Sequence, residues 1–182
     1  LWNMLKNFQM PCKAEGFDEV EVVYTKPEYD GYYGDPFAYI EELKKYDQGN
    51  SHHKLSLGTH MIRAGKWYLA NNNCFDDVAL AAYMHDIGKP YCRTETNMKD
   101  EVDGEIHYYN HHSCGAYLSL FFNMVDWSWI DKQYVALLIE LHMRPHLEWK
   151  QSEQKLLKDT NLFGEKIIAD VYYIHDCDLA AH

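Results

Sequence analysis

The residues of this chain best suited to chemistry are an adjacent histidine and aspartate, His85 and Asp86. They follow a run of small apolar residues within ALAAYMHDIGKP at 79–90. This run predicts a buried helix that ends on the pair, because Gly88 and Pro90 follow it as stop signals. A buried carboxylate without a partner is costly, and a divalent metal ion is one partner that offsets the cost. A His-Asp pair also occurs as an ordinary helix cap.

Other segments each place a potential metal ligand beside an apolar helical stripe. Together with His85 and Asp86, these ligands are His60, His111, His142 and Asp178. Any one of the histidines could be an ordinary core or surface residue, but the ordered set would point into one interior. Imidazole and carboxylate groups together suit Mn²⁺, Fe²⁺, Co²⁺, Ni²⁺ or Zn²⁺ better than Ca²⁺. The set therefore predicts a metal centre.

Hydrophobic spacing predicts the helices that must position these ligands. They cover about 36–48, 54–70 and 78–87, then a segment from 111, a segment from 132 to 142, a short amphipathic stretch at 152–158, and 167–178. Asp35, Asp76 and Asp131 are the expected N-caps, and Pro145 the expected stop after His142. Tyr117, Leu120, Phe121 and Met124 are the expected core face of the segment from 111. The pattern predicts an all-α bundle.

Two regions of the sequence do not read as helix. Residues 19–25 alternate apolar and acidic side chains, which is typical of a strand. Residues 93–109 are polar and contain Asp103-Gly104, which predicts a small β-hairpin or a mobile lid. We therefore expect two parts: an irregular arm or linker at 1–34 and a helical domain at 35–182.

The composition limits the possible functions. The chain has 182 residues, 47% of them hydrophobic, and a net charge of −11, which disfavours binding to long nucleic-acid duplexes. Apolar runs are too short for a membrane span and no signal peptide is recognisable. Five scattered cysteines without a CxxC motif suit a reducing cytoplasm. Because Leu1 is not an initiator methionine, we expect the chain to be part of a longer multidomain protein of unknown oligomeric state.

The order of the ligands, with MHDIGKP around the pair, resembles the HD-domain superfamily of metal-dependent phosphohydrolases. DGEIHYYNHHSCGA at 103–116 resembles the corresponding segment of HD domains attached to tRNA nucleotidyltransferases. The resemblance covers about residues 51–182. FQMPCKAEGFDEVEVVY at 8–24 resembles the tail of P-loop polynucleotide-kinase-like domains, so residues 1–34 are interpreted as a possible remnant of an upstream kinase-like domain.

The resemblance implies an all-helical HD fold with four ligands for a first ion: His60, His85, Asp86 and Asp178. Members that keep two middle histidines hold a second ion through Asp86, His111 and His142. It implies one or two ions of Mn, Fe, Co, Ni, Mg or Zn. Two positions stay open, because Asp176 competes with Asp178 as the last ligand and His112 competes with His111.

The same resemblance implies hydrolysis of phosphomonoester or cyclic phosphate bonds by a metal-activated water, with Asp86 bridging the ions or orienting the nucleophile. Lys89 is the first candidate to stabilise charge on the phosphate; the competing interpretation is a solvated lysine at a helix end. His53, Arg144 and His146 are further phosphate-contact candidates. Tyr91, Tyr108 and Tyr109 could stack a base or pack in the core. His52, His107, His175 and His182 are interpreted as structural or surface residues.

The expected substrates are nucleotides or nucleic-acid ends, RNA ends above all. The alternative from a different class is a non-catalytic regulatory module that binds a metal or a nucleotide within a larger RNA-processing or kinase protein. A purely structural helical bundle is the third possibility.

Overall fold

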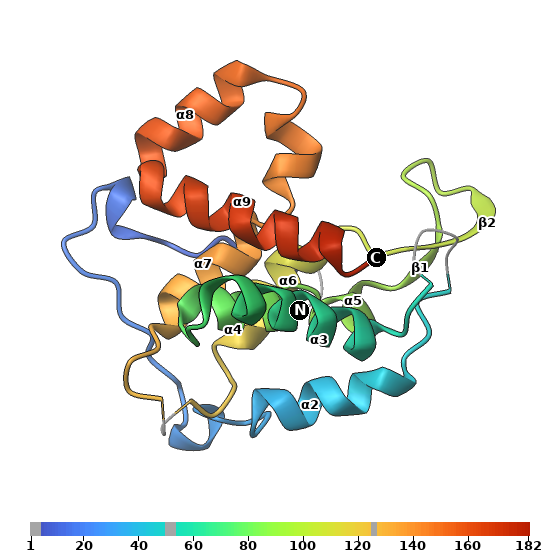
Figure 1. Ribbon diagram of the computed structural model, residues 1–182, viewed down its shortest axis with the longest axis horizontal. Coiled ribbons are helices and arrows are strands. Elements are labelled where there is room, and N and C mark those ends of the chain that lie inside the picture. The colour runs from blue at the N-terminus through green and yellow to red at the C-terminus, as the bar shows by residue number, and fades with distance from the viewer. Residues whose placement is uncertain (1–4, 50–53, 125–126) are drawn as a thin grey trace.

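A computed structural model describes residues 5–49, 54–124 and 127–182, and these residues are mostly helical (Figure 1). The prediction of a mainly helical protein is confirmed, and the described residues also contain one small antiparallel sheet of two strands. The α-helices are α2 (Pro36–Glu42), α3 (Leu57–Asn72), α4 (Asp77–Met84), α5 (Lys89–Cys92), α6 (His111–Ser119), α7 (Lys132–Leu141), α8 (Glu153–Phe163) and α9 (Glu165–Ala180). Pro145–Trp149 (η4) forms a π-helical turn, and Lys13–Glu15 (η1), Pro27–Tyr29 (η2) and Leu43–Lys45 (η3) form 3₁₀ turns.

Helix α4 is the centre of the fold. Every residue from Val78 to Met84 is buried, so this short helix is covered on all sides. It packs against α3, α7 and α9, which surround it in Figure 1. A helix that is apolar around its whole circumference has to lie in the interior. The end of α4 therefore delivers the residues that follow it, His85 and Asp86, to the middle of the molecule.

The predicted N-caps of three helices are confirmed. Asp35 accepts a hydrogen bond from the backbone of Ala38 at 2.8 Å, and Asp76 one from Ala79 at 3.0 Å. Asp131 accepts two, from the backbone N–H groups of the second and third residues after it. These carboxylates satisfy amide groups that have no partner inside the helix. The caps fix where α2, α4 and α7 begin.

Several predicted helix boundaries were wrong. Helix α4 ends at Met84, so His85 and Asp86 lie in the turn after it. Pro90 does not terminate structure; it stands in the first turn of α5, where a missing N–H is tolerated. Helix α6 ends at Ser119, and α8 extends the expected 152–158 segment to Phe163. On the segment from 111, the expected core residues Leu120 and Met124 are buried, whereas Tyr117 and Phe121 are half-buried and Leu118 and Phe122 are buried in addition.

Gly88 allows the turn after α4 to touch α6 directly. A Cβ atom at Gly88 would lie 2.1 Å from the carbonyl oxygen of His111 and 2.5 Å from the backbone nitrogen of Gly115. Separations that short are impossible without backbone movement, so only glycine fits here. This close approach places Asp86 next to the first residue of α6.

The predicted hairpin is present, whereas the predicted strand at 19–25 is not. Thr94–Thr96 (β1) pairs with Val102–His107 (β2) in an irregular antiparallel register, and the pair projects at the right of Figure 1. Residues 19–25 form no strand, and the sheet found in the described part of the chain consists of β1 and β2 alone. A side chain satisfies part of their backbone instead: Gln133 Nε2 donates to the carbonyl of Val20 at 2.7 Å.

The arm packs on the outside of the helices. Phe8 contacts Tyr117 edge-on, with ring centroids 5.3 Å apart, and Tyr24 contacts Phe121 in the same way at 5.7 Å. The separation of the chain into an arm at 1–34 and a domain at 35–182 stays a prediction.

Among the described residues, no helix combines the length and the apolar character that crossing a membrane requires.

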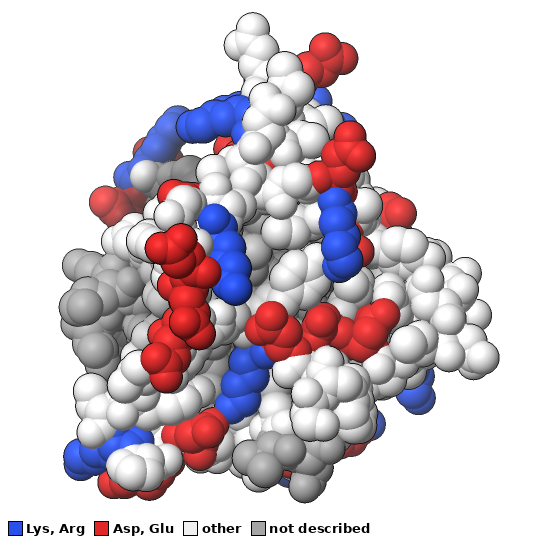
Figure 2. All heavy atoms as spheres, turned by 90° about the vertical axis from the view of Figure 1, so that its left-hand side faces the viewer, with Lys and Arg blue, Asp and Glu red and all other residues white. Residues whose placement is uncertain are grey.

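Charges of both signs are mixed on the face shown in Figure 2. Acidic and basic side chains lie next to each other there, and no continuous basic surface covers this face. Together with the net charge of −11, this distribution gives a long polyanion little to bind on this side.

Candidate metal centre

Five segments far apart in the sequence bring the six predicted ligands together. His60 comes from α3, His85 and Asp86 from the turn after α4, and His111 is the first residue of α6. His142 directly follows α7, and Asp178 lies in the last turn of α9. Five of the six side chains are buried, and Asp178 is the partly exposed one.

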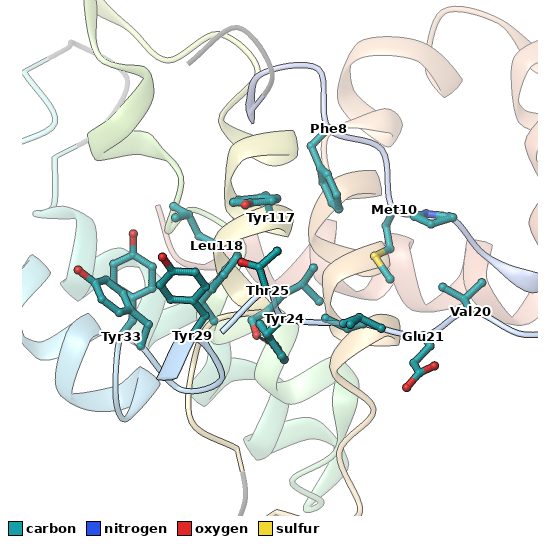
Figure 3. Close-up of a pocket in the computed structure, with 16 residues that line it drawn as sticks. Phe8, Met10, Val20, Glu21, Tyr24, Thr25, Tyr29, Tyr33, Tyr117 and Leu118 are labelled. Atoms are coloured by element: carbon teal, nitrogen blue, oxygen red, sulfur yellow. Dashed lines mark hydrogen bonds between the residues drawn. The ribbon is translucent and has the colours of Figure 1, made fainter. Parts of the chain in front are cut away.

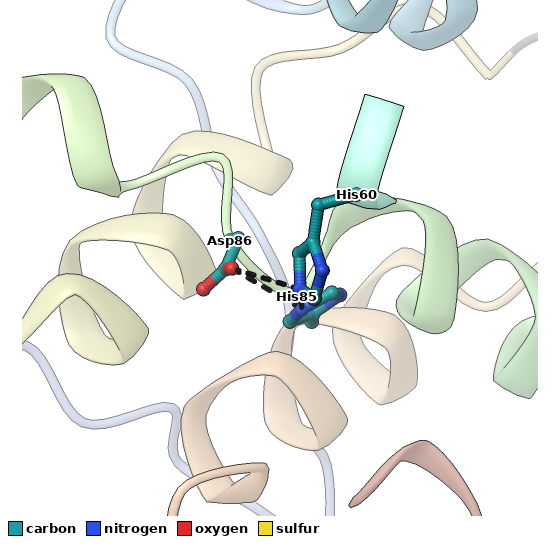
Figure 4. Close-up of side chains that lie close together, drawn as sticks. All are labelled: His60, His85 and Asp86. Carbon is teal, nitrogen blue, oxygen red and sulfur yellow. Dashed lines mark hydrogen bonds and ion pairs between the residues drawn. The ribbon is translucent and has the colours of Figure 1, made fainter. Parts of the chain in front are cut away.

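The first ligand group consists of His60, His85, Asp86 and Asp178. His60 Nε2 lies 2.9 Å from Asp178 Oδ1, 3.5 Å from Asp86 Oδ2 and 3.2 Å from His85 Nε2. His85 Nε2 lies 3.3 Å from the same Asp86 oxygen and 3.6 Å from Asp178 Oδ1. Figure 4 shows the two rings and the carboxylate turned toward one another. Ligand atoms about 2.1 Å from one ion lie about 3.0 to 3.4 Å apart when adjacent, so these spacings suit coordination.

The second ligand group uses the other oxygen of Asp86. Asp86 Oδ1 lies 3.1 Å from His111 Nε2 and 4.0 Å from His142 Nε2, and the two imidazole nitrogens are 3.4 Å apart. Asp86 therefore faces His60 and His85 with Oδ2 and the second pair of histidines with Oδ1. The described residues thus contain two buried His/Asp clusters that share one carboxylate and could each hold a metal ion.

Backbone carbonyl groups orient three of the four rings. The Nδ1 atoms of His85, His111 and His142 lie 2.9, 2.8 and 2.6 Å from the carbonyl oxygens of the residues three positions earlier. An Nδ1–H that donates to a carbonyl leaves Nε2 with its lone pair free for a metal. All three Nε2 atoms face the Asp86 carboxylate, so the three rings are oriented as ligands of a metal site would have to be.

Asp178 and His111 lie with the other candidate ligands, whereas the competing residues Asp176 and His112 do not. Asp178 faces the histidines, whereas Asp176 is exposed on another side of α9. His111 belongs to the second group, and the neighbouring His112 is turned away from Asp86 into a polar cavity. Burial and the nearby His111 and Arg144 lower the pKa of His112 to about 4, so its imidazole stays neutral.

Electrostatic coupling within the clusters is strong. Burial alone would raise the pKa of Asp86, but Lys89, His85 and His111 hold it well below its usual range. Burial lowers the pKa of His85, yet Asp86 and Asp178 outweigh this effect and raise it to about 10. Burial and the two neighbouring histidines His111 and His85 depress the pKa of His142. A metal bound through His85 has to displace a proton, so metal affinity should rise with pH.

Lys89 is buried rather than solvated, which excludes the surface interpretation of this residue. Its Nζ lies 2.7 Å from Asp86 Oδ2 and 2.9 Å from Gln48 Oε1, and the residue is only 5% exposed. A buried ammonium group needs such partners. Lys89 therefore compensates part of the carboxylate charge in the protein without metal.

The other residues predicted to contact a phosphate are not seen beside Asp86 as Lys89 is. His53, like His52, falls outside the described residues. His146 is exposed on η4, and Arg144 is bound to Asp159, with Nη1 2.6 Å from Oδ2. Arg144 still lines a polar cavity of about 270 Å³ together with His112 and Glu140, next to the second ligand group.

Three tyrosines were considered for base stacking. Tyr108 is buried and donates its hydroxyl proton to the carbonyl of Gln48 at 2.5 Å, which makes it a core residue. Tyr109 is half-buried and stacks on His107 with ring centroids 5.3 Å apart. Tyr91 is partly buried within the α5 region.

Sequence reasoning missed three residues near the centre. Gln48 accepts a hydrogen bond from Lys89, which lies 41 residues later in the sequence, and no local sequence pattern predicts such a contact. Glu140 is buried in the last turn of α7. Burial raises the pKa of its carboxyl to about 7, although a hydrogen bond from the Met10 amide lowers it. His182 lies 3.6 Å from Asp178, and its i,i+4 spacing from that aspartate was the available signal.

A second, apolar cavity lies away from the ligands. It measures about 520 Å³ and lies between the arm and the C-terminal half of α6 (Figure 3). Aromatic side chains dominate its lining: Phe8, Tyr24, Tyr29, Tyr32, Tyr33, Tyr117 and Phe121. None of the six candidate ligands lines this cavity, so it is separate from the two ligand groups.

Comparison of the chain with protein-family models, with curated proteins and with solved structures finds no match in any of the three.

Proposed function

We propose that this protein is a metal-dependent phosphohydrolase of the HD type with two divalent ions. The observation that carries the proposal is the position of Asp86, whose two oxygens face two separate pairs of histidines. A carboxylate between two imidazole-rich groups is the arrangement expected of a bridging ligand in a two-metal hydrolytic site.

The donor set fits borderline divalent ions. Four imidazole nitrogens and two carboxylates suit Mn²⁺, Fe²⁺, Co²⁺, Ni²⁺ or Zn²⁺, and Mg²⁺ fits less well because it prefers oxygen ligands. The carbonyl groups behind His85, His111 and His142 are the outer partners that metal-binding histidines usually have. When bound, such ions lower the pKa of a coordinated water to near neutrality and offset phosphate charge.

The protein residues would have distinct tasks in this reaction. Asp86 would hold both ions at a fixed separation, and His60, His85 and Asp178 would complete the first group while His111 and His142 complete the second. Lys89 beside Asp86 places a cation at the edge of the centre, where charge develops on a phosphate group during hydrolysis.

The proposed substrates are phosphomonoesters or cyclic phosphates of nucleotides and nucleic-acid ends, with RNA ends foremost. Support comes from the sequence resemblance to HD domains of tRNA nucleotidyltransferases and from the mixed surface charge, which suits a short polyanion better than a long duplex.

Hydrolysis of chromogenic phosphate esters tests the proposal. Metal-stripped protein is supplied with Mn²⁺, Co²⁺ or Ni²⁺ and assayed on p-nitrophenyl phosphate, its bis ester and a nucleoside 2′,3′-cyclic phosphate. We expect turnover that Asp86→Ala and Asp178→Asn abolish and that Asp176→Asn, the matched control two residues away on the same helix, retains. No turnover with any metal, alongside tight metal or nucleotide binding, would favour the non-catalytic module instead.

A further inference from the structure

His182 lies directly beside the first ligand group. Its Nε2 is 3.6 Å from Asp178 Oδ1, and its ring centroid is 5.0 Å from that of His60. The donor atoms of His60, Asp178 and His182 all lie within 4.8 Å of one another. These contacts bring a third imidazole to a group that already holds two.

Helix α9 explains this position. Asp178 and His182 are four residues apart, which places them on one side of a helix. The backbone continues in helical conformation through Ala181, whose N–H donates to the carbonyl of Asp178 at 3.1 Å. His182 therefore points the same way as Asp178, toward His60 on α3.

The spacing is that of a ligand rather than of a distant neighbour. The 3.6 Å between His182 and Asp178 equals the distance between His85 Nε2 and Asp178 Oδ1 within the first group. Unlike the buried His60 and His85, the side chain of His182 is 38% exposed. His182 therefore approaches the group from the solvent side.

We propose that His182 is an additional ligand of the first metal ion, bound through Nε2 and closing that ion off on its solvent side. The proposal rests on the metal centre of the proposed function. It gives the first ion five protein ligands against three for the second, so the second ion is the one that keeps more positions for substrate oxygens.

Cobalt binding tests this assignment without an activity assay. Metal-stripped wild-type protein, His182→Ala and the control His175→Ala are titrated with Co²⁺, and dissociation constants are measured by competition with a chelator. His175 lies on α9, two turns before His182, half-buried and outside the ligand groups found among the described residues. Proton NMR of the Co²⁺-loaded proteins then counts the coordinated histidines through their paramagnetically shifted imidazole N–H signals.

We expect His182→Ala to lose one shifted N–H signal and to bind one of its two Co²⁺ ions at least about tenfold more weakly, because loss of even an outer partner of a metal ligand costs about ten- to a hundredfold in affinity. The visible absorption spectrum of the Co²⁺-loaded proteins is a third measurement. Added imidazole should restore the wild-type spectrum in His182→Ala, because the position left by the ring is open to solvent. His175→Ala should match the wild type in all three measurements.

Two results would overturn the assignment in distinguishable ways. If His182→Ala keeps every shifted signal and the wild-type affinities while Asp178→Asn loses an ion, the centre stands and His182 is no ligand. If the wild type takes up no Co²⁺, the metal centre and the assignment of His182 both fail.

Discussion

Asp86 Oδ1 lies 3.1 Å from His111 Nε2, which joins the turn after α4 to the first residue of α6. The other oxygen of the same carboxylate faces His60 and His85. One side chain thus belongs to both ligand groups, so its removal should have a different effect from the removal of a ligand that belongs to one.

The first prediction concerns metal stoichiometry. Asp86→Ala should lose both ions, whereas His142→Ala should lower the metal content from about two ions per chain to about one. Elemental analysis after dialysis against Mn²⁺ or Co²⁺ measures both, and circular dichroism checks the fold. His146→Ala, exposed on η4, is the control that should keep both ions. An unchanged metal content in His142→Ala would rule out the second ion.

The second prediction concerns the contact between Gly88 and α6. Gly88→Ala should destabilise the protein by about 3 kcal/mol or more, because its Cβ would meet backbone atoms at 2.1 and 2.5 Å. Gly115→Ala should cost clearly less, because its closest contacts, Ile139 Cγ2 at 3.2 Å and the Gly88 backbone nitrogen at 3.3 Å, require shifts of only a few tenths of an ångström. Urea unfolding of both variants provides the measurement, and equal losses would contradict the tight turn.

The third prediction separates the charge of Lys89 from its packing. Lys89→Met leaves the buried Asp86 carboxylate without its ammonium partner and should cost about 3 to 5 kcal/mol in chelated protein. In metal-loaded protein the ions compensate the same carboxylate, so the loss should be markedly smaller. Urea unfolding with a chelator and with saturating Mn²⁺ compares the two.

A control for this comparison is available on the surface. Lys155→Met removes an exposed ion pair with Glu148 and should change stability by less than about 1 kcal/mol in either condition. A Lys89→Met loss that is the same with and without metal would show that Asp86 does not bind an ion.

The fourth prediction concerns pH. The pKa of Glu140 is about 7 in the folded protein against an ordinary value of 4.5. Between these values the folded state holds a proton that the unfolded chain releases, so this group makes stability fall as pH rises from about 4.5 to 7. The total effect is up to about 3 kcal/mol.

Glu140→Gln should remove this decline, since the amide oxygen can still accept the hydrogen bond from the Met10 backbone. Unfolding free energies of chelated wild type and variant, measured from pH 4.5 to 8, give the difference. Glu148→Gln, at the rim of the same cavity, should follow the wild-type curve. A constant difference between Glu140→Gln and the wild type across this range would refute the raised pKa.

Local patterns predicted three helix N-caps and the six side chains that meet in the interior, whose role as ligands stays a prediction. Asp35, Asp76 and Asp131 cap as expected, because a cap depends on a few neighbouring residues. The ligands converge because each follows a hydrophobic stripe, and the packing of those stripes decides where the polar neighbours point.

Features that depend on distant partners were not predictable in this way. A strand at 19–25 requires a neighbouring strand to pair with, and the sheet seen among the described residues pairs β1 only with β2. Lys89 is buried only because Gln48 and Asp86 both reach it. His182 is interpreted from the sequence as a structural or surface residue, because its position beside His60 depends on the packing of α9 against α3, which no local pattern predicts.

The carbonyl contacts of His85, His111 and His142 have a consequence for how the centre is loaded. Each ring is anchored to backbone only three residues away, so its orientation is set once the adjoining helix end has folded. An ion bound at the proposed centre would therefore meet side chains that have already given up most of their rotational freedom. Little reorganisation should accompany capture of the ion, and the chelated protein should keep its fold.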